Sequence, residues 1–272
     1  MSPSRDPSAL RDLAGRSTVV FLHAHPDDEA IFTGGTIALL AARGHRVVVV
    51  YATSGELGFG SSAELGVRRR AEAQQACVLL GVDRVVFLHH CDSGLDDDPR
   101  SQPHGAFAGV AVDHAAEHLA AILDGERAEA LVTYDSGGIY GHPDHVHAHR
   151  VASAAVDLVG LDTWYEVTVD REYLHFVDTH VAAAASESLP RPRAVGSVSV
   201  EIDLTVDVRS VLGVKHAAID AHSSQVADPT FGAAGAFPDV YGYEWFLRHG
   251  VPGPLDALAI DTTTAPVQVD SP

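Results

Sequence analysis

The sequence predicts an α/β fold in which a mostly parallel sheet carries helices on both faces, followed by additional C-terminal strands and a helix. Over the first 160 residues, short apolar runs alternate with helical stretches, which is the rhythm of a doubly wound layer structure. Runs such as 47–51 are apolar without alternation, as expected for parallel strands covered on both faces. With 272 residues and 46% hydrophobic residues, the chain can bury a large core. We expect one domain, 1–272, with its core at about 17–250 and flexible termini.

The expected elements follow from these patterns in chain order. Four N-terminal strands are expected at 17–24, 45–53, 84–90 and 129–134, with helices between them at 38–44, 68–81 and 110–125. Gly81 is placed to end the second helix. Runs rich in β-branched and aromatic residues then predict strands at 163–169, 172–178 and 197–204, before a helix at 207–225. Small residues and two prolines predict a loop at 182–196, and 261–272 is expected to fray.

Charge and composition exclude several kinds of partner. Lys and Arg number 18 against 37 Asp and Glu, a balance of −19, so no basic face for nucleic acid or a membrane surface is expected. The first twenty residues suggest neither a secretory signal nor an anchor, and no long apolar run follows. Cys77 and Cys91 are too few for a disulfide framework. We therefore expect a cytoplasmic protein, with homo-oligomerisation left open.

Polar clusters follow each of the four N-terminal strands. They read "HAHPDDE" at 23–29, "TSGE" at 53–56, "HHCDSG" at 89–94 and "YDSGGIYGHPDH" at 134–145. In open α/β sheets, ligands bind in the crevice beyond the carboxyl ends of the strands. We therefore expect the four clusters to converge on one site.

The first cluster places three consecutive acids, 27–29, at the end of an apolar strand. Such crowding is unfavourable unless a helix N-terminus or a cation lies nearby. A helix start would stabilise each of Asp27 and Asp28 by roughly 0.3–1 kcal/mol, but it leaves His25 unexplained. His25 and Asp28 are three residues apart and can address one point, with Asp27 beside them. This pattern suits two metal ligands and a separate base.

The second cluster adds histidines at helical spacing. His142, His145 and His149 follow i, i+3, i+7 and would share one stripe of a helix, while His147 points elsewhere. Pro143 fits the first helical turn. Two nitrogens and one carboxylate oxygen, with water in a fourth position, form an ordinary catalytic zinc set, although Fe²⁺ or Co²⁺ would also suit it. Either cluster alone is equally well explained by helix capping, but together they favour a metal.

"AHPDDE" and "GHPDH" together resemble the PIG-L/LmbE-like family of zinc-dependent N-acetylglucosaminyl deacetylases, over about residues 17–225. The resemblance implies a Rossmann-like fold and removal of the N-acetyl group from a small N-acetylglucosamine derivative, with an amino sugar as the small-molecule partner. Two alternatives stay open: an amidase that cleaves a mycothiol-like thiol conjugate, and a non-catalytic sugar-binding module, because one doubly wound scaffold hosts many functions.

The same resemblance implies roles for individual residues. His25, Asp28 and His145 match the zinc ligands, and Asp27 matches the general base. His142 matches the histidine beside the tetrahedral intermediate, Asp144 would orient or charge it, and Tyr140 would help to polarise the carbonyl.

Further residues are expected around the substrate. Arg69 and Asp92 match substrate-binding positions, although Arg69 could instead belong to a solvated helix face. Lys215, His222 and Gln225 would lie near the rim, or form one side of an ordinary amphipathic helix. We expect His149 to be a packing or supporting residue, and His89 and His90 to be buried polar groups with partners.

Overall fold

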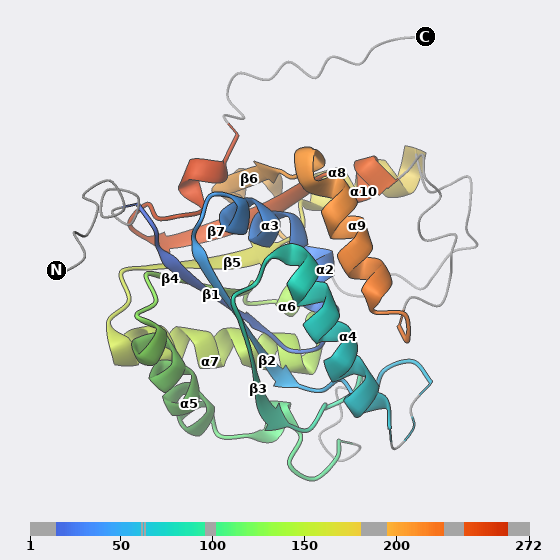
Figure 1. The fold of residues 1–272 in the computed structure, drawn as a ribbon, viewed down its shortest axis with the longest axis vertical. Helices are drawn as coiled ribbons and strands as arrows, with labels where there is room; N and C mark the ends of the chain where they lie inside the picture. The colour runs from blue at the N-terminus through green and yellow to red at the C-terminus, as the bar shows by residue number, and fades with distance from the viewer. Residues whose placement is uncertain are drawn as a thin grey trace, which may run out of the picture.

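One mixed sheet forms the centre of the computed structural model, which describes residues 15–60, 62, 64–95, 102–180, 195–225 and 237–260. Within these ranges, seven strands lie in the order β3 (Arg84–His90), β2 (Arg46–Thr53), β1 (Thr18–His23), β4 (Ala130–Tyr134), β5 (Thr163–Thr168), β7 (Tyr243–Gly250) and β6 (Leu204–Asp207) (Figure 1). The strands from β3 to β5 are parallel, whereas β7 is antiparallel to both neighbours. The predicted mostly parallel α/β fold is confirmed.

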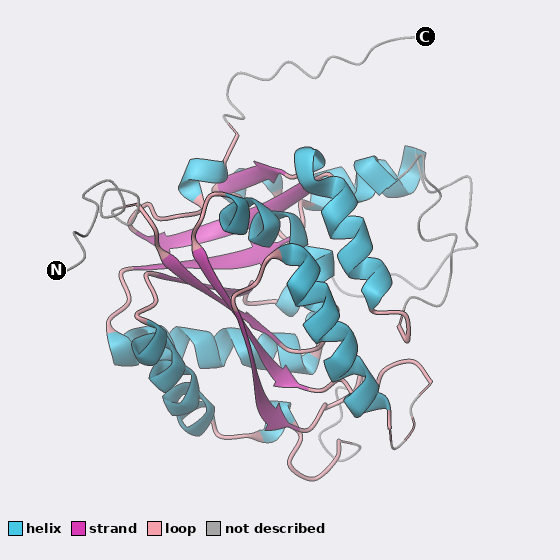
Figure 2. Cartoon of the chain, viewed as in Figure 1, coloured by secondary structure: helices cyan, strands magenta, loops and turns pink. Residues whose placement is uncertain are grey.

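Helices cover both faces of this sheet, as expected (Figures 1 and 2). On one face lie α5 (Val112–Glu126) and α7 (Pro143–Val159), which pack against each other. On the other lie α2 (Asp28–Phe32), α3 (Gly34–Ala42), α4 (Leu65–Leu80) and α9 (Leu212–Ala221). The remaining α-helices of the described ranges are α6 (Gly138–Gly141), α8 (Arg171–His180) and α10 (Phe237–Tyr241). α4 ends at Gly81, whose φ of 80° closes the last turn as the sequence predicted.

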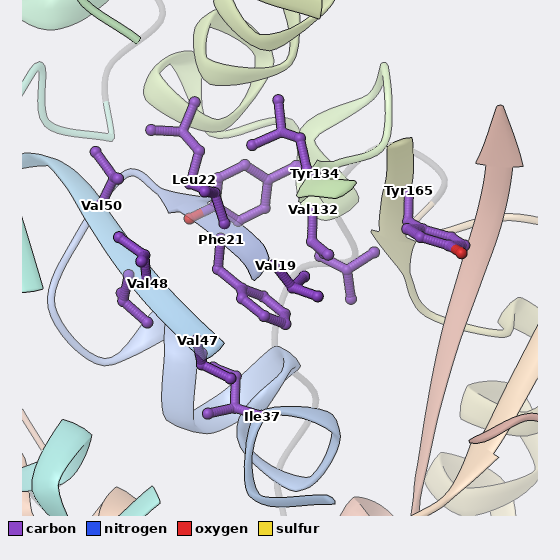
Figure 3. Close-up of a cluster of buried hydrophobic side chains, with 14 of the residues drawn as sticks. Val19, Phe21, Leu22, Ile37, Val47, Val48, Val50, Val132, Tyr134 and Tyr165 are labelled. Carbon is purple, nitrogen blue, oxygen red and sulfur yellow. The ribbon is translucent and has the colours of Figure 1, made fainter. Parts of the chain in front are cut away.

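The core is built around β1 and β2, which are neighbours in the sheet. Figure 3 shows their apolar side chains packed together, including Val19, Phe21, Leu22, Val47, Val48 and Val50, all fully buried. Full burial of each such side chain is worth about 1.5–3 kcal/mol. β1 and β2 pair in register from Thr18 with Arg46 to His23 with Tyr51, so their carboxyl ends lie together. A rigid base therefore supports the polar clusters that follow these strands.

Several elements that the sequence predicts for the C-terminal part differ in the structure. Residues 172–178 lie within α8 and are not a strand, because the Asp170 carboxylate accepts the backbone N–H groups of Glu172 and Tyr173 and starts a helix. The expected strand 197–204 is also wrong, since Ser199–Glu201 forms a 3₁₀ turn and only Leu204 enters β6. β7 was not expected at all. Residues 182–194 and 261–272 lie outside the described ranges.

Lys215 serves the fold and does not reach the rim of the site. Its Nζ lies 2.7 Å from Glu244 Oε1, and both side chains are 1% exposed. The Glu244 carboxylate also accepts the N–H groups of Gly35 and Thr36, so this pair joins β7 and α9 to the start of α3.

Lys215→Met is expected to lower the free energy of unfolding by about 3 kcal/mol, because it leaves a buried carboxylate without its counter-charge. Urea unfolding measures the loss. Lys215→Met/Glu244→Gln should recover part of it, since the double variant buries no net charge. A single variant as stable as the wild type would contradict this role.

Candidate active site

The four polar clusters converge at the carboxyl ends of β1, β2, β3 and β4, as predicted. Residues of the first, third and fourth clusters, with residues 57–59 directly after the second, line a cavity of about 500 Å³. Its lining includes His25, Asp27, Asp28, Arg69, Asp92, Tyr140, His142 and Gln225. A larger open groove of about 1070 Å³ lies near Ser17 and Thr163, at the amino ends of β1 and β5, and none of the predicted site residues lines it. The smaller cavity is therefore the candidate active site.

Asp28 is the point at which the two histidine-bearing segments meet. Its Oδ2 lies 3.3 Å from His25 Nδ1 and 3.3 Å from His145 Nε2. The same oxygen accepts the backbone N–H of His25 (2.9 Å) and the hydroxyl of Tyr134 (2.7 Å). Burial alone would raise the pKa of Asp28, but the interactions with His145 and His25 outweigh it and hold this pKa well below its usual range. Asp28 is thus a fixed carboxylate between two imidazoles.

His145 is fully buried, and neither of its ring nitrogens makes a hydrogen bond within the described structure. Leaving a buried polar group unsatisfied costs about 1–3 kcal/mol. The ring stacks on Tyr134 with a centroid distance of 4.0 Å, so it is held in place by packing. Nitrogens of His25, His142 and His145 lie within 4.8 Å of one another. Together with Asp28, this arrangement fits a divalent cation that would satisfy the orphaned nitrogen.

His25 is oriented from its far side by carboxylates. Its Nε2 lies 3.1 Å from Asp144 Oδ2 and 3.5 Å from Asp92 Oδ1. Burial lowers the pKa of His25, but the hydrogen bonds with Asp144, Asp28 and Asp92 prevail and raise it well above its usual value. A proton on Nε2 is held by these acids, which leaves Nδ1 directed toward Asp28 and available for a cation.

Asp144 contacts His142 as expected, but through its main chain, while its side chain contacts His25. Its buried carboxylate contacts His25 and accepts the backbone N–H groups of Ser93 (3.0 Å) and Ala108 (3.2 Å). Only its own backbone N–H reaches His142, at 3.1 Å from Nδ1. His142 therefore caps α7, and Pro143 occupies the first turn as predicted. Asp144 orients His142 through its main chain, while its side chain orients His25.

Asp27 does not cap the helix that follows it. Its backbone φ is 116°, an unusual value for a residue with a side chain, and it makes no side-chain cap of α2. Its Oδ2 lies 3.1 Å from Arg69 Nη2. Burial raises the pKa of Asp27 to about 7, although the Arg69 charge opposes this. Asp27 thus stands at the start of α2, as the helix-start explanation expected, but its carboxylate pairs with Arg69 and lines the cavity instead of capping the helix.

Arg69 is 4% exposed, so the alternative of a solvated helix face is wrong. Its guanidinium donates to the carbonyl oxygens of Gly55 (2.8 Å) and Pro26 as well as contacting Asp27. This arginine ties α4 to the loops that follow β1 and β2.

His142 and Tyr140 also line the cavity. The His142 ring lies 4.5 Å from that of His25 and 5.0 Å from that of His145. Burial, with the charges of these two histidines, lowers the pKa of His142 to about 3. Burial and the nearby Asp28 raise the pKa of Tyr140 far above its usual value. At neutral pH both side chains are therefore neutral groups that can donate a hydrogen bond.

The remaining predicted residues divide between the cavity and the core. Asp92 and Gln225 line the cavity, whereas His222 is buried, with Nε2 2.6 Å from Glu29 Oε1. His149 supports the site from behind, with Nδ1 3.2 Å from the carbonyl oxygen of Tyr134. The expectation of buried, paired histidines is wrong for His89, which is exposed, and for His90, whose buried Nε2 has no hydrogen-bond partner in the described structure.

Two residues that position the carboxylates of the site were not predicted from the sequence. Ser93 supplies both its N–H and its hydroxyl to Asp144, and Tyr134 donates to Asp28. Ser93 lies inside the "HHCDSG" cluster and Tyr134 is the last residue of β4, so their positions at strand ends were available signals. No helix in the described part of the chain is both long and apolar enough to span a membrane.

The amino-acid sequence of the chain matches a known protein family and curated relatives. The family model described as GlcNAc-PI de-N-acetylase matches residues 20–156. A 1D-myo-inositol 2-acetamido-2-deoxy-alpha-D-glucopyranoside deacetylase of Mycobacterium sp. (strain KMS) is 37% identical over 90% of this chain and 87% of its own length. A protein of the same name from Thermobispora bispora is 35% identical over 87% of this chain and 89% of its own.

Solved structures share the fold. The N,N'-diacetylchitobiose deacetylase from Pyrococcus horikoshii has a TM-score of 0.60 and 21% identity, covering 96% of this chain and 98% of its own. Both signature segments, 23–29 and 134–145, fall within the residues that the family model matches. Because that model spans half of the chain and the deacetylase relatives align over most of it, the chain belongs to the PIG-L family.

Proposed function

We propose that this protein is a metal-dependent hydrolase that removes the N-acetyl group from a small N-acetylglucosamine derivative. The observation that carries the proposal is the buried His145, whose nitrogens make no hydrogen bond in the described structure and whose Nε2 lies 3.3 Å from Asp28 Oδ2, beside the His25 ring. Its relatives in the Mycobacterium and Thermobispora strains are named as deacetylases of an acetamido sugar linked to inositol. A small amino sugar is accordingly the proposed partner.

His25, Asp28 and His145 would hold the metal. We propose zinc, because two imidazole nitrogens and one carboxylate oxygen are a common catalytic zinc set, while Fe²⁺ or Co²⁺ could use the same donors. A cation bound there lowers the pKa of water to about 7 and polarises a carbonyl group. Asp144 and Asp92 hold the His25 ring in the orientation that this binding requires.

Asp27 acts as the general base in this proposal. Its carboxylate takes a proton from the attacking water, and Arg69 keeps it directed at the cavity. The same group can then return the proton to the leaving amine. Burial raises the pKa of this carboxyl above its usual value, which favours the return of the proton to the amine.

His142 and Tyr140 stabilise the charge that develops on the carbonyl oxygen. Because the backbone N–H of Asp144 donates to His142 Nδ1, the single proton of the neutral ring lies on Nε2. Nε2–H and the Tyr140 hydroxyl can both donate to a developing oxyanion. The raised pKa of Tyr140 matters here, since a phenolate that has lost its proton could not donate.

Asp92 is proposed to bind hydroxyl groups of the sugar. It is 3% exposed, and its carboxylate accepts the backbone N–H groups of Leu57 (3.2 Å) and Gly94 (2.8 Å) at the edge of the cavity. Hydrogen bonds from His25 and these amides hold the pKa of Asp92 below its usual range against the effect of burial. Arg69 lines the same cavity, but its contacts with Asp27, Gly55 and Pro26 assign it mainly to positioning Asp27.

The substrate class is tested with an N-acetylglucosaminide, a cysteinyl-glucosaminide conjugate and chitin oligomers. We expect the highest kcat/KM for the N-acetylglucosaminide, and a loss of about 10–100-fold in Asp92→Ala, since a charged hydrogen-bond acceptor is removed. Asp92→Asn, which keeps the shape, controls for collapse of the loop. Preference for the conjugate would favour the amidase, and preference for the oligomers would contradict a monosaccharide-sized substrate.

The pH dependence of kcat/KM should have an acid limb due to Asp27. The base must be ionised, so activity is lost as the pH falls through its pKa, which is about 7 without a cation. A bound cation favours the carboxylate and places the limb below 7. Arg69→Gln removes a charge that lowers this pKa, so its limb should move upward. Constant kcat/KM between pH 4 and 7 in the metal-loaded enzyme would remove Asp27 from this role.

A further inference from the structure

Three large apolar side chains stand exposed at the mouth of the candidate active site. Leu57 is 44% exposed, Phe59 73% and Leu95 78%. All three line the cavity that also contains His25 and Asp27. Other exposed apolar residues, such as Val78 and Val200, lie outside this cavity. The polar floor of the site therefore has an apolar rim, formed by Leu57, Phe59 and Leu95.

Hydrogen bonds from the site fix this rim in place. Asp92 accepts the N–H of Leu57 and that of Gly94, the residue before Leu95. Gly94 also lies close to Leu57, because a Cβ on it would meet Leu57 Cδ1 at 3.4 Å. The carboxylate proposed to bind the sugar thus holds the backbone of Leu57 directly and that of Leu95 through its neighbour Gly94.

Phe59 is held by the amide of Gln225. Its N–H donates to Gln225 Oε1 (3.0 Å), and its carbonyl oxygen accepts from Gln225 Nε2 (3.4 Å). The preceding Gly58 leaves no room for a side chain, since a Cβ there would lie 2.3 Å from Gln225 Oε1. These bonds hold the backbone of Phe59 at the mouth of the cavity and leave its ring exposed there. An exposed apolar group at a cavity is typical of a binding surface.

We propose that the apolar rim is a subsite for an apolar aglycone of the amino sugar. The inference rests on the proposed function. Asp92 lies between the metal-binding residues and the rim, 3.5 Å from His25 Nε2 on one side and 3.2 Å from Leu57 N on the other. A sugar held by Asp92 with its acetyl group toward His142 would therefore direct its aglycone to the rim, and its acyl group away from it.

The size of the rim favours a small apolar group over a protein surface. A stable protein interface buries about 800 Å² on each partner, far more than three side chains supply. Burying about 60 Å² of an aglycone at 25 cal/mol per Å² corresponds to roughly a 10-fold gain in affinity. The gain should lower KM and leave kcat nearly unchanged, because the rim contacts substrate and transition state alike.

The test compares methyl and cyclohexyl N-acetylglucosaminides in both anomers, with the metal-loaded enzyme. We expect the cyclohexyl glycoside of one anomer to have about 10-fold higher kcat/KM, and Phe59→Ser, which removes the largest of the three rim side chains, to lower this ratio toward 1. Val200→Ser, an exposed apolar residue outside the cavity, should keep the ratio. A third arm uses the methyl glycoside with an N-octanoyl group in place of the N-acetyl group.

Three other results would contradict the proposed aglycone subsite, and each can be distinguished from the others. Equal kcat/KM for the two glycosides, or a ratio that survives in Phe59→Ser, removes the rim from aglycone binding. A preference for the N-octanoyl substrate that Phe59→Ser abolishes assigns the rim to the acyl group. A metal-loaded wild type inactive on every glycoside overturns the proposed function itself, and the subsite with it.

Discussion

Asp27→Asn is expected to keep its metal and to lose about 10²–10⁴-fold in kcat, the usual cost of removing a general base. Asparagine retains the shape of the side chain, and its carbonyl oxygen can still accept from Arg69, which lies 3.1 Å from the present carboxylate. The amide cannot accept a proton from water. The variant therefore separates positioning from proton transfer.

Metal content and kcat must be measured on the same Asp27→Asn sample. Unfolding in urea provides the control, because removal of a charge paired with the buried Arg69 could also disturb the fold. A folded, metal-loaded variant with near-normal turnover would show that another group accepts the proton.

His145→Ala is expected to lose metal and activity together. This residue brings the second histidine-bearing segment to Asp28, at 3.3 Å, and its own nitrogens have no other hydrogen-bond partner in the described structure. Removing one of three protein ligands leaves a site that cannot retain a cation through desalting. Activity should fall to background.

Stability adds a second readout for this assignment. A ligand that binds only the folded state stabilises it by about 2.7 kcal/mol at 100 times its Kd, so zinc should raise the Tm of the wild type and not that of His145→Ala. His149→Ala is the matched control, since His149 lies one turn further along α7 and contacts Tyr134 instead of the cavity. A fully loaded His145→Ala protein would show that the ligand set is different.

The N-terminal half of the fold could be predicted because its strands are long apolar runs between helical patterns. The parallel sheet buries them on both faces, so the residues that form β1 and β2 carry an unambiguous signal. The C-terminal part of the sequence indicates its secondary structure less clearly. Aromatic and β-branched residues at 172–178 suggested a strand, but a single capping carboxylate, Asp170, decided in favour of a helix.

The sequence by itself also determined which residues could form the site. Spacing of three within 25–28 and 142–145 places side chains of one segment near one another, and the rule for open sheets brings both segments to the same edge. What each residue contacts there was decided only by the tertiary structure. Asp144 holds His25 across 119 positions of sequence and Arg69 holds the loop at Pro26 across 43, while Lys215 pairs with Glu244 in the core. Spacing cannot predict these contacts, because they depend on which strands become neighbours in the sheet and on how the helices pack over them.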